Sequence, residues 1–179
     1  MRSVRTQRVV LMIGSADGSE TVARSVFAEV YFGLRDKGIE VVIASAQGGY
    51  AWSSRPARSE IETLPLLDRF WSDQTAREDF ANTLRLDEIF VQDFDGGFCI
   101  GIPGAIWQSQ TNTPAAALIA QFMKAAKAVV ILTDQIDIAP DGAGQGLLIL
   151  GGRDWPPDAA VLALLAAIEP RQFREGDMP

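Results

Sequence analysis

The chain has 179 residues, of which 47% are hydrophobic, and this composition indicates a folded protein with a sizeable core, not a disordered segment. Its formal net charge of −7 argues against nucleic acid and anionic membranes as partners. Histidine is absent and Cys99 is the single cysteine, so the commonest general base is missing and no internal disulfide can form.

Compartment and domain limits follow from the same features. A lone cysteine favours a reducing compartment, and no apolar run approaches the length needed to span a membrane. The apolar run after the basic first residues is too short for a secretory signal, and Gly14 and Ser15 follow it as they would follow a strand. We expect a cytoplasmic protein with one domain over residues 1–179 and a frayed tail at 171–179.

Five short apolar runs predict strands that are buried on both faces of a sheet, because they are rich in Val, Ile and Leu and do not alternate with polar residues. In chain order they are Arg8–Ile13, Ile39–Ala44, Phe98–Ile102, Ala128–Leu132 and Leu147–Leu150.

Helical patterns occupy most of the intervals between these runs. Val22, Val26, Val30 and Leu34 form one stripe within Ser19–Lys37, and Gly38 suits the position just after a helix. A second helix is predicted at Ala115–Ala126 after the cap Thr113 and Pro114, and a third at Asp158–Ile168 after Pro156 and Pro157. Alternating strands and helices predict an α/β fold. We expect a doubly wound, mostly parallel sheet of five to six strands with helices on both faces, a flavodoxin-like three-layer sandwich.

The excursion at residues 47–95 is longer than an ordinary connection between elements. It contains Tyr50, Trp52 and Trp71, and its pattern predicts one helical piece, Gln74–Leu84. Long excursions of this kind are either packed surface structure or functional lids and interface elements. The sequence leaves both interpretations open.

Three segments in order resemble the ThiJ/PfpI superfamily, relatives of the class I glutamine amidotransferases. They are FAEVYFGLRDKGIEVVIASAQGG (Phe27–Gly49), FANTLRLDEIFVQDFDGGFCIGIPGAIW (Phe80–Trp107), and the helix Ala115–Ala126 with the strand after it. The chain is most similar to the branch of heat-shock chaperones and glyoxalase III proteins. The resemblance implies the fold above, a homodimer, and acyl or carbonyl chemistry at a cysteine thiolate that a carboxylic acid activates.

The nucleophile of that family is not present in this chain. Its cysteine position falls on Thr133, at the end of the predicted strand Ala128–Leu132, and the next position is Asp134. A threonine hydroxyl is hardly ionised at neutral pH, and an unperturbed aspartate is too acidic to be an efficient base for it. The pair is interpreted as a degenerate strand-end turn, with a polar ligand contact and a catalytic role as the alternatives.

The two supporting parts of the family's site differ as well. The glutamate that tunes the thiol falls on Val26, while Glu29 matches a further glutamate of the motif. The Gly-Gly turn that supplies N–H groups to an oxyanion is Pro103-Gly104, and proline has no N–H to donate. Only 13 residues, Asp134 to Gly146, precede the last strand, so the helix that follows the family's nucleophile is expected to be absent or short.

Ligands of doubly wound sheets bind at the carboxyl ends of the strands, so the side chains that follow the strands predict one cleft. The predicted ligand-binding residues are Ser15, Asp17, Val26, Gly104, Trp107, Thr133 and Asp134. Cys99 lies inside a predicted strand and is expected to be core. No cofactor and no metal site is expected, and the glycine run Asp141–Gly146 lacks the Lys-Ser/Thr pair of a phosphate loop.

The leading functional hypothesis is a non-catalytic ThiJ/PfpI-like protein that binds a small molecule or serves as a protein-interaction module. The first alternative is a divergent hydrolase or glyoxalase-type enzyme that uses Thr133 with Asp134. The second is a chaperone-like holdase, which requires an exposed apolar patch of several hundred Å². Expected partners are a second copy of the chain and a small-molecule ligand, with no nucleic acid and no membrane.

Overall fold

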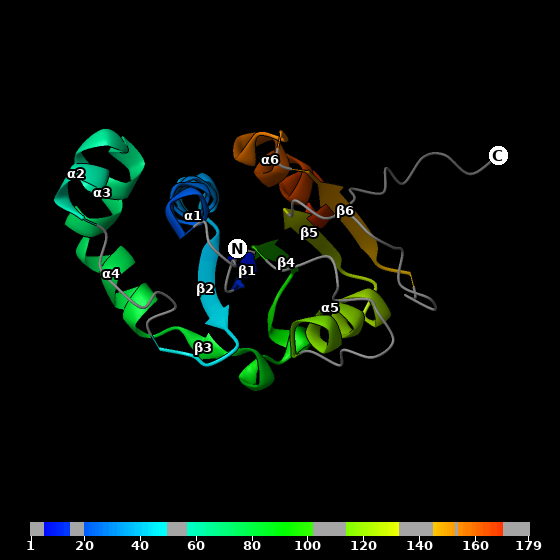
Figure 1. The fold of residues 1–179 in the computed structure, drawn as a ribbon. Helices are drawn as coiled ribbons and strands as arrows, with labels where there is room; N and C mark the ends of the chain where they lie inside the picture. Colours follow the sequence, from blue (N-terminus) through cyan, green and yellow to red (C-terminus); the bar gives the residue numbers. More distant parts are fainter. Residues whose placement is uncertain are drawn as a thin grey trace, which may run out of the picture.

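The computed structural model describes residues 6–14, 20–49, 57–101, 114–132, 145–152 and 154–169. In these ranges six strands form one parallel sheet in the order β3-β2-β1-β4-β5-β6 (Figure 1). Their bounds are β1 (Arg8–Ile13), β2 (Glu40–Ser45), β3 (Leu84–Arg85), β4 (Gly96–Ile100), β5 (Ala128–Leu132) and β6 (Leu147–Gly151). The predicted α/β fold with a doubly wound parallel sheet is confirmed.

The central strands form where the sequence is apolar on both faces of the sheet. Every residue of β4 and β5 is buried, as are the last five residues of β1. The strand predicted at Phe98–Ile102 lies closer to the N-terminus in the structure, where it begins at Gly96 and ends at Ile100. Glycine is required there by close packing: a Cβ on Gly96 would lie 2.9 Å from the Ile168 side chain, and one on Gly97 would lie 2.9 Å from the Met12 side chain.

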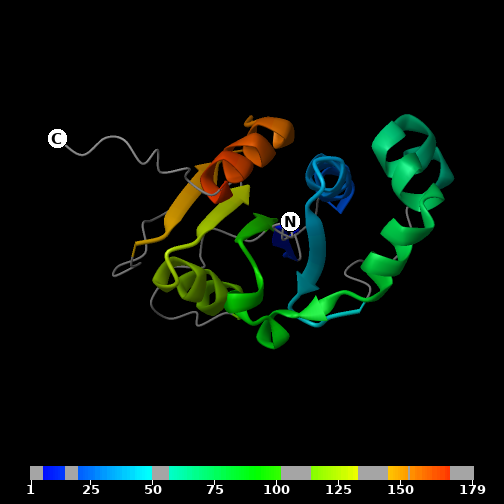
Figure 2. The same ribbon diagram turned by 180° about the vertical axis from the view of Figure 1, so that it is seen from behind.

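Helices cover both faces of the sheet (Figures 1 and 2). On one face lie α1 (Glu20–Arg35) and α6 (Pro157–Ile168), and on the other lies α5 (Pro114–Lys124) beside the short turns η1 (Leu86–Glu88) and η2 (Val91–Asp93). Alternate residues of β1 divide the core accordingly, with Val9 and Leu11 in the cluster under α1 and α6 and Met12 in the cluster under α5. This is the three-layer arrangement that the sequence predicted.

The excursion between β2 and β4 differs from its prediction. The sequence predicted one helix there, whereas the structure has α2 (Arg58–Thr63), α3 (Pro65–Ser72) and α4 (Gln74–Ala81), named here the helical arm. Pro65 opens α3, and the Asp73 side chain caps α4 by accepting from the Ala76 N–H at 2.9 Å. The predicted helical end at Leu84 was wrong, since Leu84 pairs with Ala44 as part of β3.

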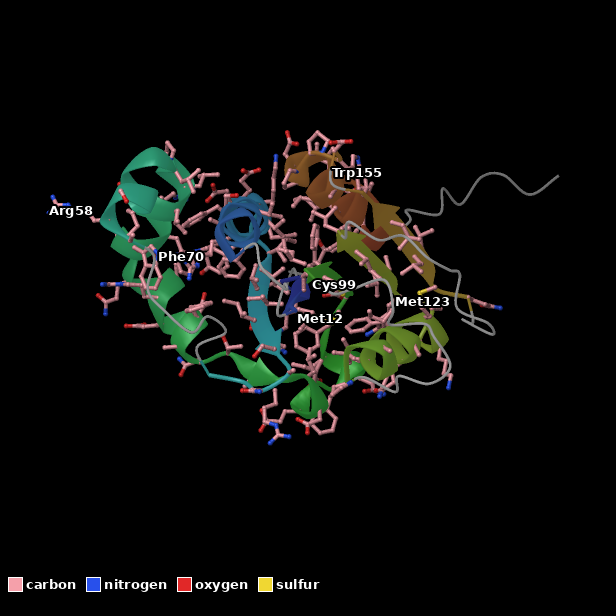
Figure 3. All side chains as sticks on the ribbon, in the orientation of Figure 1. Met12, Arg58, Phe70, Cys99, Met123 and Trp155 are labelled. Carbon is pink, nitrogen blue, oxygen red and sulfur yellow. The ribbon has the colours of Figure 1, made fainter. Side chains whose placement is uncertain are left out.

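The helical arm packs against α1 through an aromatic cluster. Its members are Phe27, Tyr31 and Phe32 of α1, Phe70 and Trp71 of α3, and Phe80 of α4, with neighbouring ring centroids 5.2–6.4 Å apart. Figure 3 shows Phe70 between the arm and α1. These contacts make the described part of the excursion packed surface structure on the flank of α1.

Polar contacts reinforce the same junction. The Tyr31 hydroxyl donates to Asp79 at 2.6 Å, and Arg35 pairs with Asp73 at 2.9 Å. Arg69 donates twice to Asp36 at 2.7 Å and lies 3.8 Å over the centroid of the Phe32 ring. The helical arm is therefore joined to α1 by buried aromatic rings and by hydrogen-bonded charges around them.

The remaining helix ends lie close to their predicted positions. The helix predicted to run through Lys37 ends at Arg35, and Gly38, with φ +80°, closes the turn after it by donating its N–H to the Arg35 carbonyl at 2.9 Å. Pro157 is the first residue of α6. The predicted cap Thr113 and the tail 171–179 lie outside the described residues. None of the described helices is both long and apolar enough to cross a membrane.

Candidate functional site

The predicted cleft lies where the order of strands reverses. From β1 the chain moves to β2 on one side and later to β4 on the other, so the switch point lies between β1 and β4. The register places Ile13, Ile100 and Leu132 side by side at the carboxyl ends of β1, β4 and β5. The Gly14 N–H extends the β1–β4 ladder by donating to the Ile100 carbonyl at 2.8 Å.

Three of the predicted site segments leave the sheet from these adjacent strand ends. Ser15 and Asp17 follow β1, Gly104 and Trp107 follow β4, and Thr133 and Asp134 follow β5. All six lie outside the described residues, as does Pro103. The described strand ends therefore bring the three segments to neighbouring starting points, while the positions of their side chains remain predictions.

Val26 is the predicted site residue that the structure describes. It lies on α1, half-buried, and packs against the core cluster under α1 and α6. Its side chain has no group that could titrate or accept a proton. The position where the resemblance places an activating glutamate is therefore occupied by a packing residue.

Glu29 is the other acidic residue of the motif on α1, and its described surroundings are not those of the missing glutamate. It lies about one turn further along α1, where burial raises the pKa of its carboxyl and Asp158 of α6 raises it further. The acidic residue that acts on the Glu29 carboxyl is therefore Asp158, at the beginning of α6. Its environment is the junction between the two helices of this face.

Arg24 is a residue that sequence reasoning missed. It is 4% exposed and lies on the second turn of α1, the helix that follows the carboxyl end of β1. Arginine is rarely buried this completely, and its guanidinium brings a positive charge near the first turns of the helix. It lies opposite the valine stripe, a position that the helical pattern gives no reason to expect buried.

Cys99 is confirmed as a core residue. It lies in β4 at the centre of the sheet, is 0% exposed, and its Sγ donates to the Met12 Sδ at 3.6 Å (Figure 3). Burial raises the pKa of its thiol far above the usual range, so the nucleophilic thiolate does not form near neutrality. The single thiol of the chain is therefore unsuited to the family's chemistry.

A metal centre finds no support in the described part of the chain. The described residues hold no group of three or more Cys, Asp or Glu side chains placed to bind an ion, and the sequence contains no histidine. Some of the described acidic side chains instead pair with arginine, such as Asp36 with Arg69 and Asp87 with Arg85.

No family model and no curated protein matches the sequence, whereas solved structures match its fold. Rapid Encystment Protein 24 KDa (REP24) of Francisella tularensis is 13% identical over 91% of this chain and 99% of its own, with a TM-score of 0.56. The protein APC35852 is 14% identical over 92% of this chain and 99% of its own, with a TM-score of 0.58. A DJ-1 superfamily protein of Agrobacterium tumefaciens is 13% identical over 72% of this chain and 54% of its own, with a TM-score of 0.44.

The first two likenesses extend along nearly the whole length of both chains. At these identities they establish a shared fold and carry no information on activity. They show that this chain shares its fold with these two proteins.

Proposed function

We propose that this chain is a non-catalytic ThiJ/PfpI-like protein that binds a small ligand at the carboxyl edge of its sheet, as a homodimer. The observation that carries the proposal is Val26, an apolar residue packed on the core where the resemblance implies the activating glutamate. Thr133 in the cysteine position and Pro103 in the Gly-Gly turn point the same way.

The remaining groups do not compensate for these losses. A threonine nucleophile needs an adjacent base, histidine is absent from the sequence, and an ordinary aspartate is a weak base near neutrality. Cys99 is enclosed in β4 and cannot reach a substrate. Binding requires less than catalysis: a cleft at the switch point and a few polar groups are sufficient.

Native mass spectrometry of the gently purified protein tests the ligand. A stoichiometric small molecule is expected on the wild-type chain and is expected to be lost in Thr133→Tyr, which fills the strand-end position. Thr75→Tyr is the matched control, because Thr75 is exposed on α4 of the helical arm. Retention of the molecule in Thr133→Tyr would place it elsewhere, and a protein without any bound molecule would count against the ligand-binding role.

An activity assay tests the non-catalytic part of the proposal. The divergent-enzyme alternative predicts turnover of a small aldehyde that is lost in Thr133→Ala. Enzyme-like turnover with that dependence would overturn the proposal and assign a catalytic role to Thr133. Unchanged background reactivity in wild type and variant supports a binding protein.

A further inference from the structure

Strand β6 forms an open and wholly apolar edge of the sheet. It lies at one end of the strand order, and β5 is its one strand neighbour in the described part of the chain (Figures 1 and 2). Its five residues, LLILG, include no charge and no proline. Leu147 is 52% exposed and Leu150 is 36% exposed. An edge of this kind is a template for pairing with another strand, and natural proteins usually protect it with charges, proline or short length.

Among the described residues, β6 leaves a leucine exposed on each face of the sheet and packs its other large side chains on the core. Leu148 packs on the core cluster under α5, and Ile149 packs on the cluster under α1 and α6. Because successive side chains point to opposite faces, Leu150 shares the α5 face and Leu147 shares the α6 face. A strand that covers this edge must therefore bring apolar side chains to both faces at once, which β6 of a second copy does.

The charge distribution also favours a second copy. The chain has a net charge of −7, so two copies repel each other unless they meet where acidic residues are absent. Neither β6 nor the stretch Ala159–Ile168 of α6 contains a charged residue, and Leu162 on the outer side of that helix is 55% exposed. A charged peptide would find no opposite charge in β6 or in this stretch of α6.

We propose that β6 is the dimer interface, in which two copies pair antiparallel about a two-fold axis perpendicular to the sheet. In the register that matches all five residues, Leu148 lies opposite Leu150 of the other copy, and Ile149 lies opposite its own counterpart. The two sheets become one, with like layers continuous across the junction. This inference rests on the dimer included in the proposed function and is independent of the ligand.

Helix α6 supplies the surface that the strands alone lack. A stable interface buries roughly 1,200–2,000 Å² in total, which exceeds what one pair of five-residue strands provides. Val161 faces α1, since it is the nearest side chain to Gly33, and by helical geometry Ala159 and Ala163 lie on the opposite side of α6. Small, uncharged side chains there allow the two α6 helices to approach each other.

Analytical ultracentrifugation of the full chain tests the location of the interface. The wild type is expected to be a dimer, and Leu147→Lys with Leu150→Lys is expected to raise the dissociation constant on the order of 100-fold, because four ammonium groups would be desolvated or brought together. The matched control is Leu84→Lys with Phe90→Lys, two exposed apolar residues near the β3 end of the molecule, which should remain dimeric. Circular dichroism verifies the fold of each variant.

A mixing experiment tests the two-fold register and does not depend on the double-lysine variant. Leu150→Lys and Leu150→Glu are each expected to weaken the dimer alone, and an equal mixture is expected to recover it as a heterodimer. The proposed register places the two residues at position 150 on the same face as diagonal neighbours, within reach of long side chains.

The possible results separate this inference from the proposed function. A dimer that the lysine variant and the single variants leave intact would overturn the β6 interface and leave the homodimer standing. A monomeric wild type at tens of micromolar protein would overturn both the interface and the homodimer, while the ligand proposal is decided by mass spectrometry alone. If the β6 edge binds an unrelated protein and does not bind a second copy of the chain, the inference is also wrong.

Discussion

The two ends of the sheet are covered in different ways. At the β3 end, the strand has two residues, Arg85 pairs with Asp87 at 2.6 Å, and the helical arm adds buried aromatic rings and hydrogen-bonded charges against α1. At the β6 end, five apolar residues form the edge strand, and leucines on both faces remain exposed. The first end has a short, charged edge strand beside the packed arm, and the second has the composition of a surface that another molecule covers.

The two flanks of α1 show the same difference in electrostatics. Toward the helical arm, α1 and the residues after it present Arg35 to Asp73 and Asp36 to Arg69, so opposite charges meet. Toward α6, Glu29 experiences Asp158, so like charges meet. The arm is joined to α1 by ion pairs and aromatic rings together, whereas the contact of α1 with α6 combines apolar packing with a like-charge pair.

Removing an aromatic ring from the arm junction should have the largest effect on stability. Phe70 is 0% exposed, and its ring centroid lies 5.3 Å from that of Phe27 and 5.7 Å from that of Phe80. Phe70→Ala is expected to lower the free energy of unfolding by about 3–5 kcal/mol, measured by urea denaturation. Phe90→Ala is the control, because Phe90 is 69% exposed and its loss should cost little. A loss below about 1 kcal/mol in Phe70→Ala would mean that the arm is not essential to the fold.

Removing the hydroxyl of Tyr31 should have the next largest effect. Tyr31→Phe deletes the 2.6 Å hydrogen bond to Asp79 and is expected to cost about 1–2 kcal/mol. Burial, and then Asp79, raise the pKa of Tyr31 above its usual value of 10.0. A raised pKa favours the protonated group in the folded state, so this stabilisation is complete below pH 10 and is lost as the pH rises further.

The measurement for Tyr31 is a pair of denaturation series at pH 8 and at pH 11. The difference between wild type and Tyr31→Phe should shrink at the higher pH, because the unfolded wild type then ionises its phenol. Equal stabilities at pH 8 would show that the hydrogen bond does not hold the arm.

A smaller effect is expected at the cap of α4. Asp73 accepts from the Ala76 N–H at 2.9 Å and also pairs with Arg35. Both contacts lower the pKa of its carboxyl, and the hydrogen bond from Ala76 has the larger effect. Asp73→Ala is expected to cost about 1 kcal/mol, or roughly 2–4 °C in Tm. Asp73→Asn keeps a capping oxygen and should cost less. Because the folded pKa is lowered, the contribution is present at neutral pH and is lost as the pH falls below the usual value of 3.8. Equal losses in the two variants would assign the effect to the ion pair and not to the cap.

The sequence predicts the elements whose burial is determined locally. Arg8–Ile13 and Ala128–Leu132 were predicted with their observed bounds, because strands covered on both faces need continuous apolar runs. Helices α2 and α3 were missed because such short helices depend on tertiary packing, which for α3 is against α1 and for α2 is against α3. Helix α4 is as short as α3 and was predicted in part. β3 has two residues, and its pairing with β2 has no local signal.

The apolar pattern of β6 was predicted and its exposure was not. A run of leucine and isoleucine predicts burial, but a sequence pattern does not tell which strand ends at the edge of a sheet. Leu147 and Leu150 have the sequence pattern of buried residues but are exposed at the edge of the sheet. Their exposure is the basis for the proposed interface.

The candidate site stays a prediction from the sequence. The rule for doubly wound sheets predicts it at the carboxyl edge, where Ile13, Ile100 and Leu132 lie side by side, and the residues expected to line it are outside the described ranges. Arg24 was missed because helical periodicity assigns it to the polar side of α1, whereas α1 is packed against both α3 and α6. Contacts between elements that are distant in the sequence decide its burial.

The smallest expected effect lies on the other flank of α1 and has the opposite sign. Burial, and then Asp158, raise the pKa of Glu29, so its ionised carboxylate opposes folding at neutral pH. This cost is absent below the usual pKa of 4.5 and develops as the pH rises through the raised pKa. Glu29→Gln should therefore raise Tm by about 1–2 °C at pH 7.5 and leave it unchanged at pH 3.5, since partly exposed positions rarely contribute more than about 0.5 kcal/mol.

Thermal unfolding of Glu29→Gln beside Asp73→Asn compares the two flanks directly, because neutralising a carboxyl should stabilise the α6 side and destabilise the arm side. A loss of stability in Glu29→Gln at pH 7.5 would mean that both flanks of α1 are held by favourable charge contacts, and the contrast between them would then rest on β6 alone.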